Sequence, residues 1–310
     1  MRRPALWDGR AAERIVAVLA GKLLAPGETG SDGAVEEASP PSRRMEVLGV
    51  PVDNLTMGET LDVIAGFIED GTPHQHVVVN VDKVVKASRD PELRRIIAQC
   101  DLVNADGMPV VWASRMLGTP LKERVAGIDL FEALMVRAAE RGWRVFLLGA
   151  REEVVAKVRS IYEARHPELV IAGHRNGYWQ PGEEEAVAEQ VRAARADLLF
   201  VAISSPMKER FLGRWQAHMR VPFAMGVGGT FDVAAGKVRR APLWMQRAGL
   251  EWLMRVLQEP RRMYRRYFIE GLPFFAMVGR ELLARRRRAV VAVGLSVGVA
   301  LAALVGGAGH

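Results

Sequence analysis

Short apolar segments alternate with helix-forming segments along most of this 310-residue chain, and this alternation limits its fold more than any other feature. Segments such as His76–Asn80 and Arg144–Leu148 have the length and apolar content of buried strands. Between them lie helix signals such as Thr56-Met57-Gly58-Glu59, a capping box expected to open a helix that runs to Asp70. Strands that alternate with helices predict a Rossmann-like α/β fold, in which helices cover a parallel sheet.

Polar residues or glycines follow the predicted strands at the points where those strands end. In a parallel sheet such positions share one edge, beyond the carboxyl ends of the strands, where open α/β sheets bind their ligands. The residues at these positions are Asn80, Asp106, Gly149, Ser204 and Gly228. The sequence therefore predicts a ligand site at this edge of the sheet.

Asp106 is the strongest catalytic candidate among them. It stands between a predicted strand over Leu102–Asn104 and a helix that begins near Pro109. The positive end of a helix favours an ionised carboxylate, so Asp106 can act in the cleft. Asp-Gly is also a common turn pair, and by position alone a turn or cap role is equally compatible. The chain is expected to break after Asn80, and the segment that follows the break, Asp90-Pro91-Glu92, has the cap, first-turn proline and acid of a helix start.

The composition favours an anionic partner and excludes several classes of protein. The formal charge is +7 and the pI is near 9.9, which points to nucleic acid, phospholipid or a phosphorylated substrate. A single cysteine excludes a disulfide framework and a cysteine metal site. The turn at Gly149 lacks the full G-x-G-x-x-G spacing, and there is no Walker lysine motif. A nucleotide-cofactor oxidoreductase and a P-loop protein are therefore disfavoured.

Changes in composition divide the chain into four predicted regions. They are a flexible extension over residues 1–44, an α/β domain over 45–247, a basic helical appendage over 248–288, and an apolar tail over 289–310. The extension is rich in Gly, Ser, Pro and Glu, which suits a linker. Glu46–Val50 is expected to form the first strand of the α/β domain.

The last two regions point to a membrane. Cations alternate with aromatic residues over Glu259–Phe268, a pattern that could bind RNA, lie on anionic lipid or hold a diphosphate. A non-catalytic basic module that binds RNA or anionic lipid is therefore an alternative to an enzyme, although it leaves Asp106 and Asn80 without a role. Residues 289–309 carry no charge and would span roughly 30 Å as a helix, enough to cross a bilayer core. We favour a transmembrane helix here over an unstructured Ala/Gly tail, with Arg285–Arg288 on the cytoplasmic side.

Several ordered blocks of sequence carry a resemblance to a known family. They are Asp90–Arg94, Ala105–Ala113, Glu123–Leu130, Gly177–Trp179, Gly226–Asp232, Ala235–Pro242, Gly249–Trp252 and Glu259–Arg262. Together they resemble the WecG/TagA/CpsF glycosyltransferase family, also called glycosyltransferase family 26. The resemblance runs from about Met45 to Phe275.

The resemblance implies an inverting, metal-independent transferase without a cofactor. The donor is a UDP-sugar, typically of the N-acetylmannosamine type, and the acceptor is a sugar linked to undecaprenyl diphosphate. Such a reaction takes place at the cytoplasmic face of the cell membrane, during synthesis of cell-surface polysaccharide or teichoic acid. The expected partners are the two substrates and an anionic membrane surface, with no nucleic acid. A homo-oligomer is compatible with this interpretation.

The resemblance also assigns site residues. Asp106 matches the proposed general base, and Asn80 is expected beside it as a second catalytic residue. The expected substrate-binding residues are Arg124, Gly127, Asp129, Gly149, Tyr178, Lys208, Glu209, Gly228, Asp232, Arg261, Arg262 and Arg265, and no metal ligand is expected. At Val78 and Lys208 the family commonly has threonine and glutamine. These two differences concern the identity of the sugars more than the fold.

Truncation after Arg288 is expected to shift the protein from the membrane pellet toward the soluble fraction, because the charge-free stretch 289–309 would be lost. Some membrane affinity should remain through the basic and aromatic residues of the appendage. Fractionation of cells that express the full or the truncated chain measures this. Full-length protein that is soluble after lysis without detergent would contradict a transmembrane helix.

Overall fold

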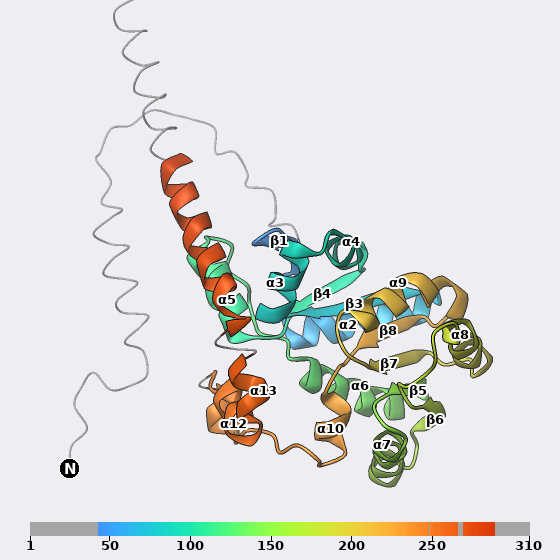
Figure 1. Ribbon diagram of the computed structural model, residues 1–310. Coiled ribbons are helices and arrows are strands. Elements are labelled where there is room, and N and C mark those ends of the chain that lie inside the picture. Colours follow the sequence, from blue (N-terminus) through green and yellow to red (C-terminus); the bar gives the residue numbers. More distant parts are fainter. Residues whose placement is uncertain (1–42, 248, 266–268, 289–310) are drawn as a thin grey trace, which may run out of the picture. The chain divides into compact units, whose positions relative to one another are not determined.

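A six-stranded parallel sheet forms the centre of the chain in the computed structural model, which describes residues 43–247, 249–265 and 269–288 (Figure 1). Its strand order is β4-β3-β8-β7-β5-β6. The strands are β3 (His74–Val79), β4 (Leu102–Ala105), β5 (Arg144–Gly149), β6 (Val170–Arg175), β7 (Leu198–Ala202) and β8 (Phe223–Gly226). The predicted α/β fold with a parallel sheet is confirmed.

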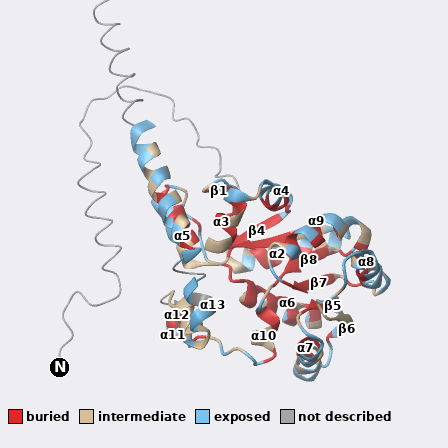
Figure 2. Cartoon of the chain, in the orientation of Figure 1, coloured by how far each residue is buried: buried red, intermediate tan, exposed pale blue. Residues whose placement is uncertain are grey.

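Helices cover both faces of this sheet because its strands carry apolar side chains on both sides. In β5, Val145 and Leu147 face one hydrophobic cluster, whereas Phe146 and Leu148 face another. The first face is covered by α2 (Met57–Asp70), α6 (Gly127–Arg141), α7 (Glu152–Arg165) and α10 (Thr230–Ala234). The second is covered by α3 (Val81–Arg89), α4 (Pro91–Gln99), α8 (Glu184–Ala193) and α9 (Met207–Met219). The central strands are consequently buried along most of their length (Figure 2).

Two of the helix starts that the sequence marked are confirmed by their capping contacts. At the start of α2, the Thr56 hydroxyl accepts from the Glu59 amide at 3.2 Å, and the Glu59 carboxylate accepts from the Thr56 amide at 2.8 Å. At the start of α4, Asp90 accepts from the Leu93 amide at 3.0 Å and Pro91 is the first helical residue.

Two local predictions were wrong. Glu46–Val50 is not one strand, because the chain turns at Leu48 and Gly49, whose φ angles are 54° and 78°. Two antiparallel strands result, β1 (Arg44–Val47) and β2 (Val50–Asp53). The second error is the break expected after Asn80. The helix α3 begins there instead, with the Asn80 side chain accepting from the Lys83 amide at 3.0 Å.

Short helices follow the sheet domain: α11 (Leu243–Arg247), α12 (Glu251–Gln258) and α13 (Pro260–Tyr264), and a further helix covers residues 272–288. Phe274 and Val278 of this last helix pack into the cluster that contains the β1–β2 valines and α5 (Met108–Met116). Within the described ranges, no helix is both long and apolar enough to cross a membrane. The predicted membrane span over 289–309, like the predicted extension up to residue 42, lies outside the described residues.

Candidate active site

The predicted edge of the sheet brings Asn80 and Asp106 together. Val79 and Ala105 are register partners in β3 and β4, so the residues that follow them emerge side by side. The Asp106 amide donates to the Val79 carbonyl at 2.8 Å, which continues the strand pairing by one step. At the same edge, Gly149 pairs in register with Ala202 of β7. The carboxyl ends of these strands therefore adjoin, as the sequence predicted.

Asp106 faces the first turn of α6. A Cβ added at Gly127 would lie 3.8 Å from Asp106 Oδ2 and 3.6 Å from both γ-carbons of Val78, so the start of the helix is in van der Waals range of both side chains. Burial raises the pKa of Asp106 to about 6. Arg124 and Arg255 lower this pKa, as does the Gly127 amide by donating to the carboxylate. The group is thus ionised at neutral pH and can still accept a proton.

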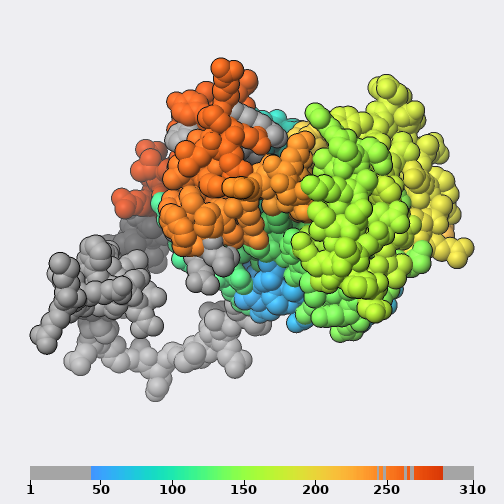
Figure 3. Space-filling view, turned by 90° about the horizontal axis from the view of Figure 1, so that it is seen from below, coloured from blue at the N-terminus to red at the C-terminus, as the bar shows by residue number. Residues whose placement is uncertain are grey.

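Charged side chains of alternating sign surround this carboxylate. Arg124, in the loop before α6, pairs with Glu251 of α12 at 3.1 Å and lies 3.9 Å from Asp129 of α6. Asp129 also forms an ion pair with Arg240. Glu251 and Arg255 line a small cavity together with Arg240 and residues of α6 and α10. Figure 3 shows the segment with α10 to α13, in orange shades, as one mass on the face that it views.

A second charged group is buried where β3, β7 and β8 end. Lys83 Nζ lies 2.8 Å from Glu209 Oε1 and donates to the Val78 carbonyl at 2.7 Å. Lys208 Nζ lies 3.3 Å from the same carboxylate oxygen. Burial alone would raise the pKa of Glu209, but Lys83 and Lys208 outweigh it and hold the pKa at about 2. Glu209 is therefore a fixed negative charge between two ammonium groups.

Glycines at the end of β8 and just after it leave room for the Lys208 side chain. A Cβ on Gly226 would come within 2.8 Å of Lys208 Cε, and one on Gly228 would lie 3.6 Å from its Nζ. Gly228 also has a φ of 54°, which favours glycine. Asp232, predicted to bind substrate, follows in α10 and lies 3.9 Å from Lys237.

Glycines also allow close backbone contact at the other end of the edge. Gly149 has a φ of 129°, and an added Cβ would lie 2.5 Å from backbone atoms of Ala202. Gly177, after β6, packs against Gly149, with its amide donating to the Ala150 carbonyl at 2.8 Å. Tyr178 follows directly and is 69% exposed. The predicted Gly149 and Tyr178 thus belong to one turn region, separate from the contacts of Asp106.

No contact with Asp106 is seen for the described appendage arginines that were predicted to bind substrate. Arg261 is exposed on α13, and Arg265 pairs with Glu270 at 3.1 Å. The side chain of Arg262 lies outside the described part of the structure. The appendage arginine that influences Asp106 is instead Arg255.

Sequence reasoning missed four charged residues of this site: Lys83, Arg240, Glu251 and Arg255. The spacing of Glu251 and Arg255, one turn apart on a predicted helix, was a usable signal. Arg240 and Glu251 also fall inside sequence blocks that carried the family resemblance. Lys83 had no such signal, because α3 itself was not predicted.

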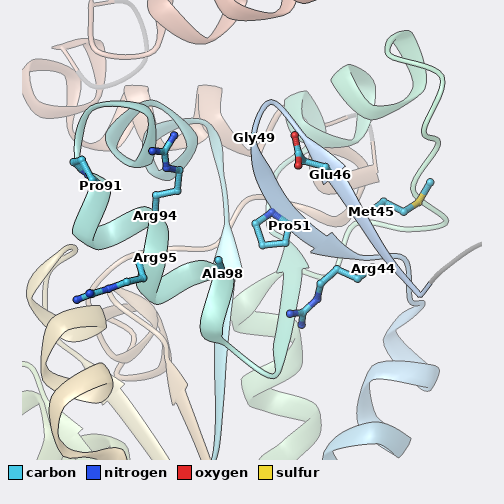
Figure 4. Close-up of a pocket in the computed structure, with 9 residues that line it drawn as sticks. All are labelled: Arg44, Met45, Glu46, Gly49, Pro51, Pro91, Arg94, Arg95 and Ala98. Atoms are coloured by element: carbon cyan, nitrogen blue, oxygen red, sulfur yellow. The ribbon is translucent and has the colours of Figure 1, made fainter.

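A larger groove, of about 770 Å³, lies elsewhere, between the β1–β2 hairpin and α4 (Figure 4). It is lined by Arg44, Met45, Glu46, Gly49, Pro51, Pro91, Arg94, Arg95 and Ala98. None of these is a predicted site residue. Its helix α4 precedes β4, whereas Asp106 follows that strand, so the groove and the carboxyl edge are different surfaces.

The fold and these side chains define an α/β protein with a half-buried carboxylate and several cations at the carboxyl edge of its sheet. Residues 45–288 match the model of the Glycosyl transferase WecG/TagA/CpsF family. This match covers most of the chain, so the protein belongs to that family and is a glycosyltransferase. Within the described residues, no three His, Cys, Asp or Glu side chains are grouped so that they could hold a metal ion.

Replacement of Glu209 by glutamine is expected to lower the free energy of unfolding by roughly 3–5 kcal/mol at pH 7, because two buried ammonium groups lose their shared carboxylate. The pKa of Glu209 is lower in the folded chain than the ordinary value near 4.3, so its stabilisation is complete above that value and disappears as the pH falls toward 2. The difference between wild type and Glu209→Gln should therefore shrink between pH 5 and pH 3. Urea unfolding at several pH values measures it.

A matched control is Glu92→Gln. Glu92 is an exposed residue of α4 that pairs with Arg210, the neighbour of Glu209 on α9. Its effect should stay below about 1 kcal/mol at every pH. Equal effects of the two substitutions would show that the buried group does not hold the strand ends.

Proposed function

We propose that this glycosyltransferase moves a sugar from a UDP-sugar to an acceptor sugar linked to undecaprenyl diphosphate, with inversion at the anomeric carbon. The observation that carries the proposal is Asp106, a carboxylate with a pKa of about 6 at the carboxyl edge of the sheet, beside cationic side chains. Membership of a glycosyltransferase family supports the general reaction. The donor, the acceptor and the stereochemistry come from the resemblance of the motifs.

Asp106 is proposed as the general base. It takes the proton of the acceptor hydroxyl while the hydroxyl oxygen attacks the anomeric carbon on the face opposite UDP. The bond between that carbon and the diphosphate oxygen breaks, and UDP leaves with the electron pair. A base with a pKa near 6 is suited to this role, because it is ionised at neutral pH yet more basic than an ordinary aspartate. Asn80, next to Asp106 at the strand edge, is proposed to orient the acceptor.

Arginines are proposed to offset the charge that develops on the UDP leaving group. A guanidinium can pair with a phosphate in a bidentate manner, so no metal ion is required for this task. Arg124 and Arg255, whose charges act on Asp106, are the first candidates, and Arg240 lines a small cavity together with Arg255. The exposed Arg261 and Arg265, together with Arg262, would join them when the appendage closes on the donor.

The sugars are proposed to be of the N-acetylmannosamine type or related to it. Val78 lies against Gly127 beside Asp106, where its side chain offers no hydrogen bond to a sugar. Lys208 extends toward Gly228 and presents a cation where the family commonly has an amide. Both side chains are therefore proposed to influence which sugar is accepted.

The chain is proposed to act at the cytoplasmic face of the cell membrane, in synthesis of a cell-surface polysaccharide or teichoic acid. Leu272, Phe275 and Leu283 of the helix over 272–288 are each more than half exposed, and Arg286–Arg288 follow on the same helix. Exposed apolar and basic side chains on one helix suit contact with anionic lipid. The proposal includes the four regions predicted from the sequence, with residues 289–310 as the membrane tail.

Asp106→Asn is expected to lower turnover by roughly 10²–10⁴-fold while the affinity for UDP is retained, because the amide cannot take the acceptor proton. In wild type, kcat/KM should fall below about pH 6 as Asp106 becomes protonated. Release of UDP in the presence of a lipid-linked acceptor measures both effects.

Asp62→Asn serves as the control, since Asp62 is an exposed residue of α2 paired with Arg137. Its turnover should match wild type. Turnover of Asp106→Asn within a fewfold of wild type would exclude Asp106 as the base. A rate abolished by EDTA and restored by Mg²⁺ would contradict the arginine account.

A further inference from the structure

Glu251 connects the C-terminal helices to the site through one ion pair. Its Oε2 lies 3.1 Å from a terminal nitrogen of Arg124, 127 residues away in sequence. Both side chains are largely buried, with 16% and 18% of their surfaces exposed. An ion pair shielded in this way is stronger than a surface pair, and removal of one partner leaves the other buried without its counter-charge.

The position of Glu251 within α12 makes it suited to hold this helix in place. Glu251 is the first residue of α12, where the helix dipole favours a negative charge. Leu250, the residue before it, has no polar side-chain atom with which to cap the helix. Arg255 follows one turn later and therefore lies on the same side of α12. The Glu251–Arg124 pair consequently determines where Arg255 stands relative to Asp106.

We propose that Glu251 is a positioning residue of the transferase site, which holds Arg124 and the first turn of α12 against the sheet beside Asp106. This inference rests on the proposed function, because it gives Glu251 a role in preparing Asp106 and the arginines for transfer. Glu251 itself contacts neither the acceptor nor the leaving group. It acts through Arg124, which lies 3.9 Å from Asp129 and whose charge lowers the pKa of Asp106.

The charges that face Asp106 allow the role of Glu251 to be tested through the pKa of Asp106. They are Arg124 in the loop before α6, and Glu251 and Arg255 on α12, while Asp129 of α6 faces Arg124. Glu251 raises the pKa of Asp106, and the two arginines lower it. Glutamine at position 251 can still bind Arg124 but has no charge, so the pKa of Asp106 should fall. A residue that only stabilised the fold would not move this titration.

The experiment compares wild type with Glu251→Gln, Glu251→Ala and the control Glu123→Gln. Glu123 precedes Arg124 in the same loop, is exposed, and accepts from the Met57 amide instead of facing Asp106. For Glu251→Gln, the acid limb of kcat/KM should move to lower pH by roughly half a unit or more. For Glu251→Ala, kcat should fall roughly tenfold or more, with a smaller change in KM for the UDP-sugar, because Arg124 and Arg255 lose their fixed positions. Glu123→Gln should behave as wild type.

Hydrogen exchange provides a readout that does not require activity. Amides of residues 251–258 should exchange faster in Glu251→Ala than in wild type or Glu123→Gln, because α12 has lost its ion pair with Arg124. An unchanged acid limb in Glu251→Gln, or unchanged exchange in Glu251→Ala, would overturn the inference. If wild type transfers no sugar from any UDP-sugar, the proposed function fails, and the exchange measurement still decides whether Glu251 holds α12.

Discussion

The packing of the half-buried Asp106 carboxylate against the first turn of α6 is the interaction on which the proposed chemistry depends. Burial weakens the acid, whereas the helix amide and the arginines keep it ionised at neutral pH. Gly127 at the start of α6 supplies that amide and lies in van der Waals range of both Val78 and Asp106. The pKa of Asp106 also depends on α12, because the charges of Glu251 and Arg255 both contribute to it. A single carboxylate thus links the end of a strand, the start of a helix and the C-terminal helices.

The Lys83–Glu209–Lys208 group links several elements at the same edge of the sheet. Lys83 joins α3 to the end of β3, and Lys208 lies against Gly226 and Gly228 at the end of β8. A buried charged group of this kind is costly unless it is paired, so it favours one arrangement of these elements over others. The site of Asp106 therefore rests on a framework fixed by charge as well as by apolar packing.

The alternation of strands and helices was sufficient to predict the fold, because strands buried on both faces read as short apolar runs. The placement of Asn80 and Asp106 at one edge followed from the parallel topology alone. The β1–β2 hairpin was missed because its turn is formed by Leu48, a residue that rarely adopts a positive φ. The Arg124–Glu251 pair could not be predicted, because it depends on how a distant helix packs and not on any local pattern. The roles of the site residues stay predictions.

The most direct test of the account is a titration of Asp106 itself. Carbon-13 NMR of the protein labelled at aspartate carboxyl groups, with Asp106→Asn used to assign the resonance, measures the pKa of this group in the free enzyme. The account predicts a value near 6, about two units above that of an ordinary aspartate. A value near 4 would mean that the carboxylate is solvated like a surface group, and the proposed base would lose its physical basis.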